Sequence, residues 1–207
     1  MSAALYLEGG ATGPDSKELK IRCREGFRKL LQKCGYENQR RMPRLIACGS
    51  RQAAFEDFQA AVRIAGPADY VALWIDSEDP LANPEASWDH LRARDNWQRP
   101  LGVTDDQVLF MTTCMETLIV ADRTALTEHF GAKLQTTALP PLVDLENRHR
   151  HDVQDGLVRA TRNCKNVYEK GKRSFEVLAK LSPEALAAHL PSFVRARRIL
   201  NQKLNPR

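Results

Sequence analysis

The sequence has no long hydrophobic run and no paired cysteines, and these absences narrow the classes of protein to consider. No apolar stretch approaches the length that spans a bilayer, so we expect no membrane segment. The first residues lack the basic segment and apolar block of a secretory signal, and we therefore expect a cytoplasmic protein. The five cysteines are scattered and never form a C-x-x-C pair, which is typical of reduced, buried thiols rather than of disulfides or zinc ligands.

The positive charge of the chain is concentrated in its last third. Residues 1–140 contain 17 Lys and Arg against 19 Asp and Glu, whereas residues 141–207 contain 14 against 7. The formal net charge of +5 therefore comes from the carboxyl-terminal third, where the local net charge is +7. Such a basic region fits a phosphate-backbone partner, and a solvated helical surface is the alternative explanation.

Short apolar runs alternate with stretches of helical periodicity before Pro140 and Pro141. The runs predict strands at residues 4–8, 44–48, 70–75 and 108–115, with helices beginning after Asp15 and at Ser50 between the first three. This alternation is typical of a parallel sheet with right-handed crossovers. Beyond the two prolines only helical patterns follow. The sequence thus predicts an α/β domain of residues 1–140 and a basic helical region of residues 141–207.

Acidic residues stand at the expected ends of three of these strands. Glu8 follows the first strand, Asp76, Glu78 and Asp79 follow the third, and Glu116 follows the fourth. In parallel sheets, binding and catalytic residues lie beyond the carboxyl ends of the strands. We therefore expect Glu8 and Asp76 to lie within about 10 Å of each other at one edge. Oxygen ligands without nearby His or Cys favour Mg²⁺ or Mn²⁺ over zinc. The alternative is that Asp76 caps a turn and its neighbours are solvated.

Several basic or polar residues are candidates for binding phosphate. Ser50 is expected to cap a helix, and an anion held at that helix start beside Arg51 is the alternative. Four further cations surround Gly171 and are expected to form a patch facing the acids: Lys165, Lys170, Lys172 and Arg173.

The connection of residues 81–105 shows no sustained periodicity. It carries two tryptophans and three arginines within residues 88–99, directly after the acidic cluster. We expect these residues to cover the acidic edge as a lid, or to form a short helix pinned by Trp88 and Trp97 as a satellite of the core.

Combined, these motifs resemble two known groups of proteins. Glu8 before two glycines and the D-x-E pair of Asp76 and Glu78 resemble the Toprim arrangement of topoisomerases, primases and old-type nucleases, in which a glutamate and a D-x-D pair bind divalent metal. This chain has Glu78 in place of the second aspartate, with Asp79 adjacent. Over roughly residues 4–181 the chain also resembles the bacterial domain of unknown function 4276 family. That likeness is carried by L-Y-L-E-G-G, A-C-G-S-R-Q-A-A-F, V-A-L-W-I-D-S-E-D-P, W-D-H-L with R-D-N-W-Q-R-P, C-M-E-T, the A-D at 121–122, and K-G-x-x-S-F at 170–175.

The resemblance implies a Toprim-like, Rossmann-like parallel sheet flanked by helices, with a helical basic extension. It implies a Mg²⁺- or Mn²⁺-dependent endonuclease or phosphodiesterase acting on nucleic acid, with DNA favoured over RNA. It also implies a partner ATPase of the ABC or old type in an anti-phage defence system. For such an enzyme we expect Glu8, Asp76, Glu78 and Asp79 to bind the metal and Glu116 and Lys170 to be catalytic as well; Lys170, Lys172 or Arg173 would neutralise the scissile phosphate. A non-catalytic interaction subunit and a nucleotide-sensing subunit of an ATPase complex remain open alternatives.

Overall fold

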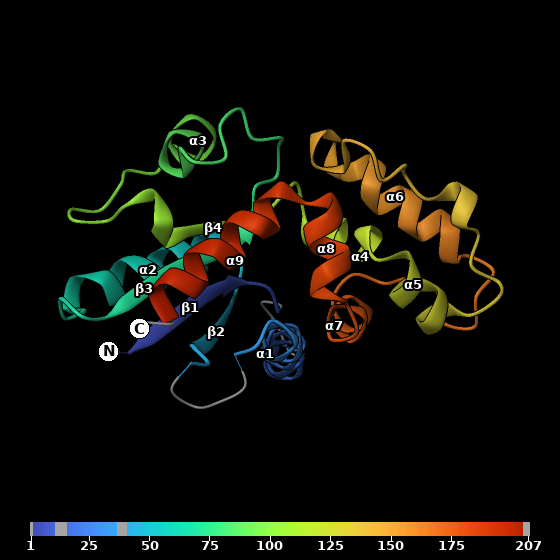
Figure 1. The fold of residues 1–207 in the computed structure, drawn as a ribbon, viewed down its shortest axis with the longest axis horizontal. Helices are drawn as coiled ribbons and strands as arrows, with labels where there is room; N and C mark the ends of the chain where they lie inside the picture. Colours follow the sequence, from blue (N-terminus) through green and yellow to red (C-terminus); the bar gives the residue numbers. More distant parts are fainter. Residues whose placement is uncertain (1, 11–15, 37–40, 205–207) are drawn as a thin grey trace.

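Four parallel strands form one sheet in the described part of the chain, and α4, α5 and α6 lie to one side of it (Figure 1). The computed structural model describes residues 2–10, 16–36 and 41–204, so the expected cap Asp15 lies outside it. The strand order is β2-β1-β3-β4, and every neighbouring pair is parallel. The strands are β1 (Ala3–Glu8), β2 (Arg44–Gly49), β3 (Tyr70–Asp76) and β4 (Val108–Met111). The predicted parallel α/β sheet is therefore confirmed, and β1 and β3 are direct neighbours.

The fourth strand is shorter than predicted. Strand β4 ends at Met111, and Met115 begins the helix α4 (Met115–Ala121) instead of ending the strand. All seven residues of α4 are buried, so the helix has no polar face that would reveal helical periodicity in the sequence. Glu116 consequently lies in the first turn of a buried helix and not at a strand end.

Helices α1 (Ser16–Lys33) and α2 (Arg51–Ile64) cover opposite faces of the sheet. In β1, Leu5 and Leu7 pack in the core with α1, while Ala4 and Tyr6 pack in the core with α2. This alternation follows from the two-residue period of a strand. Both faces of the central strands are thus buried, which explains why the sequence shows unbroken apolar runs.

The remaining helices follow β3 and β4 along the chain. Helix α3 (Ser87–Asp95) comes directly after β3, and α5 (Arg123–Phe130) comes after α4. The carboxyl-terminal region is helical, as predicted, with α6 (Arg150–Thr161), α7 (Lys172–Leu178), α8 (Pro183–His189) and α9 (Pro191–Leu204). Three short 3₁₀ helices connect these elements: η1 (Asp105–Gln107), η2 (Thr136–Ala138) and η3 (Leu145–Asn147).

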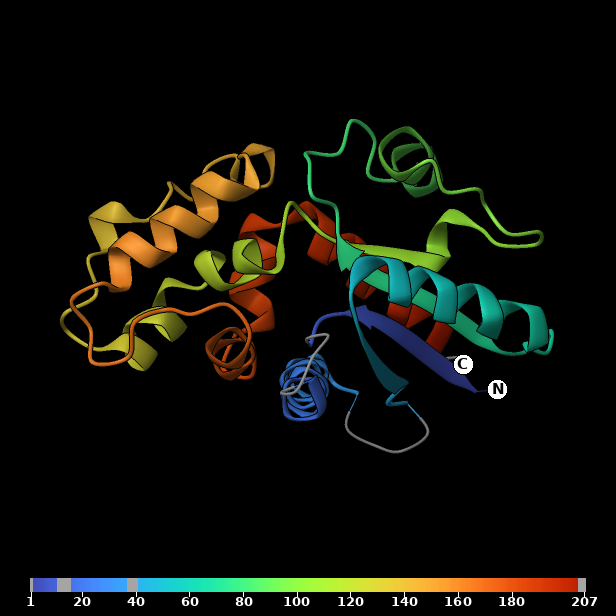
Figure 2. The ribbon, with the colours of Figure 1, turned by 180° about the vertical axis from the view of Figure 1, so that it is seen from behind.

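The carboxyl-terminal helices pack directly against the sheet and α1. Helix α9 runs along β4, where the Arg195 guanidinium donates to the Val108 carbonyl at 2.9 Å. Helix α7 lies close to α1, because a Cβ at Gly26 would come within 2.9 Å of the Phe175 carbonyl oxygen. Figure 2 shows α9 behind the sheet and α6 next to α4, at the end of the molecule away from the sheet. One apolar core therefore joins α1, α4 and the helices after residue 150.

Within the described residues no helix is both long enough and apolar enough to cross a bilayer.

Candidate metal site

The ends of β1 and β3 bring three carboxylates together. Glu8 ends β1, Asp76 ends β3, and Glu78 follows two residues later. One oxygen atom from each of these three side chains lies within 4.8 Å of the others. Because the two strands are parallel neighbours, their carboxyl ends meet at one edge of the sheet. The expected proximity of Glu8 and Asp76 is therefore confirmed.

Asp76 is the most deeply buried member of this carboxylate cluster. Asp76 is only 6% exposed, and its Oδ1 atom has no hydrogen-bond partner among the described residues. Burial raises the pKa of Asp76 well above its ordinary value, and the negative charges of Glu8 and Glu116 raise it further. A buried carboxylate oxygen without a partner fits a divalent cation, because such cations prefer oxygen ligands.

Glu8 is partly buried and is linked to Asp76 through the backbone. Its Oε2 atom accepts a hydrogen bond from the Asp76 N–H at 3.2 Å. Burial raises the pKa of Glu8, while Arg51, this backbone hydrogen bond and Lys170 oppose the increase. Because the net effect is a raised pKa, keeping Glu8 ionised in the metal-free cluster costs free energy.

Arg51 connects the carboxylate cluster to α3. Its guanidinium lies 3.4 Å from Glu8 and 2.7 Å from Asp95, and it donates to the Asp76 carbonyl. It also lies over the Trp97 ring, 5.1 Å from the centroid. Ser50 caps α2 as predicted, by accepting from the Ala53 N–H at 3.2 Å. In this structure Ser50 and Arg51 therefore bind protein groups, and the alternative, an anion held at this helix start, stays a prediction.

Glu78 has a left-handed backbone and two arginine partners. Its φ is +69°, and its N–H donates to the Thr113 carbonyl at 2.7 Å. The carboxylate lies 3.6 Å from Arg94 and forms an ion pair with Arg150. Asp79 is more exposed, lies 3.1 Å from Arg94, and falls outside the group of three mutually close carboxylates. Of the four predicted metal ligands, three are thus brought together.

Glu116 lies behind the carboxylate cluster. It is completely buried, and its two oxygen atoms accept from Tyr168 Oη at 2.6 Å and from Gln154 Nε2 at 3.1 Å. Its charge acts on Asp76, but it is not part of the close group. The sequence analysis does not identify Tyr168. The one feature in the sequence that points to it is its position two residues before Lys170.

The segment after the acids covers them and is also part of the core. Trp97 stacks on Phe55 with ring centroids 4.0 Å apart, and Trp88 lies against the same ring at 6.4 Å. From this anchored helix, Arg94 reaches Glu78, and His90 Nε2 lies 2.9 Å from the Ser77 carbonyl oxygen. The predicted cover and the predicted satellite core are therefore the same structure.

The predicted basic patch does not act on the acids as one unit. Lys170 is exposed, and its charge lowers the pKa of both Glu8 and Asp76 against the stronger effect of burial. Arg22 is the main cause of the lowered pKa of Glu18 in α1, and the charge of Lys172 adds to it. Burial is the main cause of the lowered pKa of His129, and the charge of Arg173 has a minor effect in the same direction. Lys165 is exposed. Charge counting found the basic region, but of the four residues predicted to form the patch, Lys170 is the one whose charge acts on Glu8 and Asp76.

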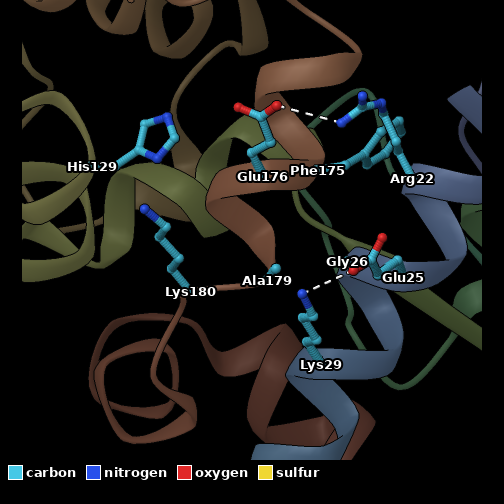
Figure 3. A pocket seen from close by; sticks show the side chains of 9 residues that line it. All are labelled: Arg22, Glu25, Gly26, Lys29, His129, Phe175, Glu176, Ala179 and Lys180. Atoms are coloured by element: carbon cyan, nitrogen blue, oxygen red, sulfur yellow. Dashed lines mark hydrogen bonds and ion pairs between the residues drawn. The ribbon is translucent and has the colours of Figure 1, made fainter.

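A separate pocket of about 380 Å³ lies between α1, α5 and α7 (Figure 3). Its two acids are matched by its cations, with Arg22 3.5 Å from Glu176 and Lys29 2.9 Å from Glu25. Because this pocket does not contain the converging carboxylates, we place the candidate chemistry at the sheet edge instead.

Together, the fold and the site define an α/β protein whose parallel sheet carries three converging carboxylates at the ends of two central strands. The model of the family described as Domain of unknown function (DUF4276) matches residues 16–200, and the chain belongs to this family. The match begins after Glu8 and includes Asp76 and Glu78. No curated protein and no solved structure gives a significant match.

Proposed function

We propose that the carboxylates of Glu8, Asp76 and Glu78 bind Mg²⁺ or Mn²⁺ and that the protein is a metal-dependent phosphodiesterase acting on nucleic acid. The supporting observation is the unpartnered Oδ1 of buried Asp76 within a group of oxygen atoms that lie within 4.8 Å of one another. Like charges this close are stabilised by a cation, and oxygen-only ligation favours hard divalent ions.

A bound divalent ion would supply Lewis-acid activation of a phosphoryl oxygen and of water. The chain would supply the orientation of the ligands: the N–H of Asp76 fixes one Glu8 oxygen, and Arg94 and Arg150 fix Glu78. Lys170, which is exposed and influences both Glu8 and Asp76, would neutralise a phosphate of the substrate. A nucleic-acid substrate, with DNA favoured over RNA, also fits the net charge of +7 on residues 141–207.

Binding and cleavage can be tested in parallel on a matched pair of variants. We expect the wild type to bind Mn²⁺ in calorimetric titrations and to cleave DNA only when the ion is present. Asp76→Asn should lose both properties, whereas Asp79→Asn, which lies outside the cluster, should keep both. Equal losses in the two variants would contradict the assignment of ligands. Retained Mn²⁺ binding without cleavage of DNA or RNA would remove the nuclease activity and keep the metal site.

The arginines around the acids support a second candidate, a non-catalytic subunit of an ATPase complex. Arg51, Arg94 and Arg150 already form ion pairs with Glu8 or Glu78, so protein cations offset part of the cluster's charge. In that case the wild type would bind no Mn²⁺. It would copurify from its host with a partner such as the ABC or old-type ATPase of a phage-defence system. Nucleotide sensing by the same acids would instead appear as ATP binding that requires Mg²⁺.

A further inference from the structure

A chain of buried hydroxyl groups anchors the loop that carries Lys170. The Gly171 N–H donates to Ser174 Oγ at 3.0 Å, and Ser174 Oγ lies 2.7 Å from Tyr168 Oη. Tyr168 Oη in turn donates to the Glu116 carboxylate at 2.6 Å. A backbone N–H can only donate and a carboxylate oxygen only accepts, so every hydroxyl in this chain has one direction of donation. Lys170 is therefore held on both sides, by Tyr168 before it and Gly171 after it.

Glu116, at the far end of this hydrogen-bond chain, is fixed in the core. Glu116 is completely buried, and Gln154 donates to its second oxygen at 3.1 Å. Tyr168 is 6% exposed, and burial, reinforced by the charge of Glu116, raises the pKa of its hydroxyl so that it stays a donor. A charged acceptor strengthens such a hydrogen bond compared with a neutral one.

The same loop leads into a contact with the strand end that supplies Glu8. Gly9, which has φ +149°, lies against the Phe175 ring, because a Cβ at Gly9 would be 3.4 Å from Phe175 Cζ. The segment from Tyr168 to Phe175 thus touches Glu116 at its beginning and the residue after Glu8 at its end. Lys170 lies between these two contacts but has an exposed side chain.

We propose that Tyr168 is a positioning residue: its hydrogen bond to Glu116 holds the loop of Lys170 between Glu116 and the end of β1, and so directs the exposed Lys170 side chain toward the metal site. This inference rests on the metal site proposed above and adds a role for a residue outside it. In that position the ammonium group offsets the charge of the acids before a cation binds and is available to a phosphate oxygen afterwards. Without the anchor, Lys170 would sample a wider volume and act less on the site.

A double-mutant cycle on Mn²⁺ affinity tests this coupling without requiring any enzymatic activity. Titrations at low salt would compare the wild type, Tyr168→Phe, Lys170→Gln and the double variant. Lys170→Gln should tighten Mn²⁺ binding roughly three- to fivefold, because an exposed positive charge near the ion is removed. Tyr168→Phe should tighten it less, by about twofold, and should have no further effect once Lys170 is Gln.

The control is Tyr70→Phe, which removes another buried hydroxyl that donates to the Asp106 carbonyl at 2.7 Å. It should leave Mn²⁺ affinity unchanged. If Tyr168→Phe changes affinity equally in both backgrounds, the tyrosine acts through Glu116 or the fold alone, and the inference is wrong. If Tyr168→Phe does not fold, Ser174→Ala breaks the same chain and must show the same dependence on Lys170. A wild type that binds no Mn²⁺ would overturn the metal site, and the inference with it.

Discussion

Replacing Asp76 with Asn should stabilise the metal-free protein, which is unusual for a change at a buried site. The carboxylate is buried, its Oδ1 has no hydrogen-bond partner in the part of the chain that the structure describes, and Glu8 and Glu116 repel it. Asparagine removes the charge, and its NH₂ group can donate to the neighbouring Glu8 carboxylate. We therefore expect the variant to be more stable than the wild type in a chelating buffer.

The size of this effect follows from the unpartnered atom. A buried polar group without a hydrogen bond costs about 1–3 kcal/mol, and relieving that cost should raise the free energy of unfolding by a similar amount. For a chain of this length each kcal/mol corresponds to about 2–4 °C in Tm. With Mn²⁺ at about one hundred times its Kd, the wild type should gain roughly 2.7 kcal/mol, whereas Asp76→Asn should gain nothing.

Thermal unfolding followed by circular dichroism, in EDTA and in Mn²⁺, measures both effects. Asp95→Asn is the matched control, because Asp95 has two arginine partners, Arg51 at 2.7 Å and Arg94 at 2.6 Å. Loss of those ion pairs should lower stability, the opposite sign. A lower Tm for Asp76→Asn in EDTA, as for the control, would refute the reasoning that the metal-free cluster is electrostatically costly.

Further predictions concern pH, the arginines, the ligands and the packing of α1. In EDTA, stability should fall as pH rises from about 3.8, the ordinary pKa of Asp, through the raised folded-state pKa values of the buried carboxylates, because the folded state binds more protons in that interval. Arg51→Ala should cost about 3 kcal/mol in urea unfolding, because it removes the largely buried cation that pairs with Glu8 and Asp95, whereas the same change at the exposed Arg63 should cost little. In Mn²⁺ titrations, Glu78→Gln should weaken binding at least tenfold and Asp79→Asn should change it little. Gly26→Ala should lower Tm, because its Cβ would meet the Phe175 carbonyl oxygen at 2.9 Å. A Cβ at Gly35 would meet no described atom within 4 Å, so Gly35→Ala tests the strain at the positive φ of Gly35 instead.

The strands and the first two metal-ligand candidates could be predicted because their signals are local. Apolar runs located β1, β2 and β3 to within one residue at either end, and the position after a strand was sufficient to bring Glu8 and Asp76 to one edge. The cap residue was equally local: Ser50 accepts a hydrogen bond from the N–H three residues later, as expected.

Helix α4 could not be predicted because it is buried on every side. A run whose apolar and polar residues are all buried fits a buried strand and a buried helix equally well. Packing against α6 and α7 decides between them. The position of Glu116 was wrong for this reason.

The partners of the acids depend on contacts between distant segments. Tyr168 reaches Glu116 across 52 residues, and Arg51 reaches Asp95 across 44. No periodicity relates such positions. The count of basic residues likewise identified the region after residue 140 as positive. It carried no information on where each side chain lies in the fold, so it could not separate Lys170 from Lys172 and Arg173.

Diffraction from crystals grown or soaked with Mn²⁺ tests the central claim most directly. An anomalous difference peak should lie between Glu8, Asp76 and Glu78, with carboxylate oxygen atoms roughly 2.1 Å from the ion, and the peak should disappear in Asp76→Asn. Absence of a peak at saturating Mn²⁺, with Arg51, Arg94 and Arg150 still paired to the acids, would contradict the metal site and leave the carboxylates with a structural role.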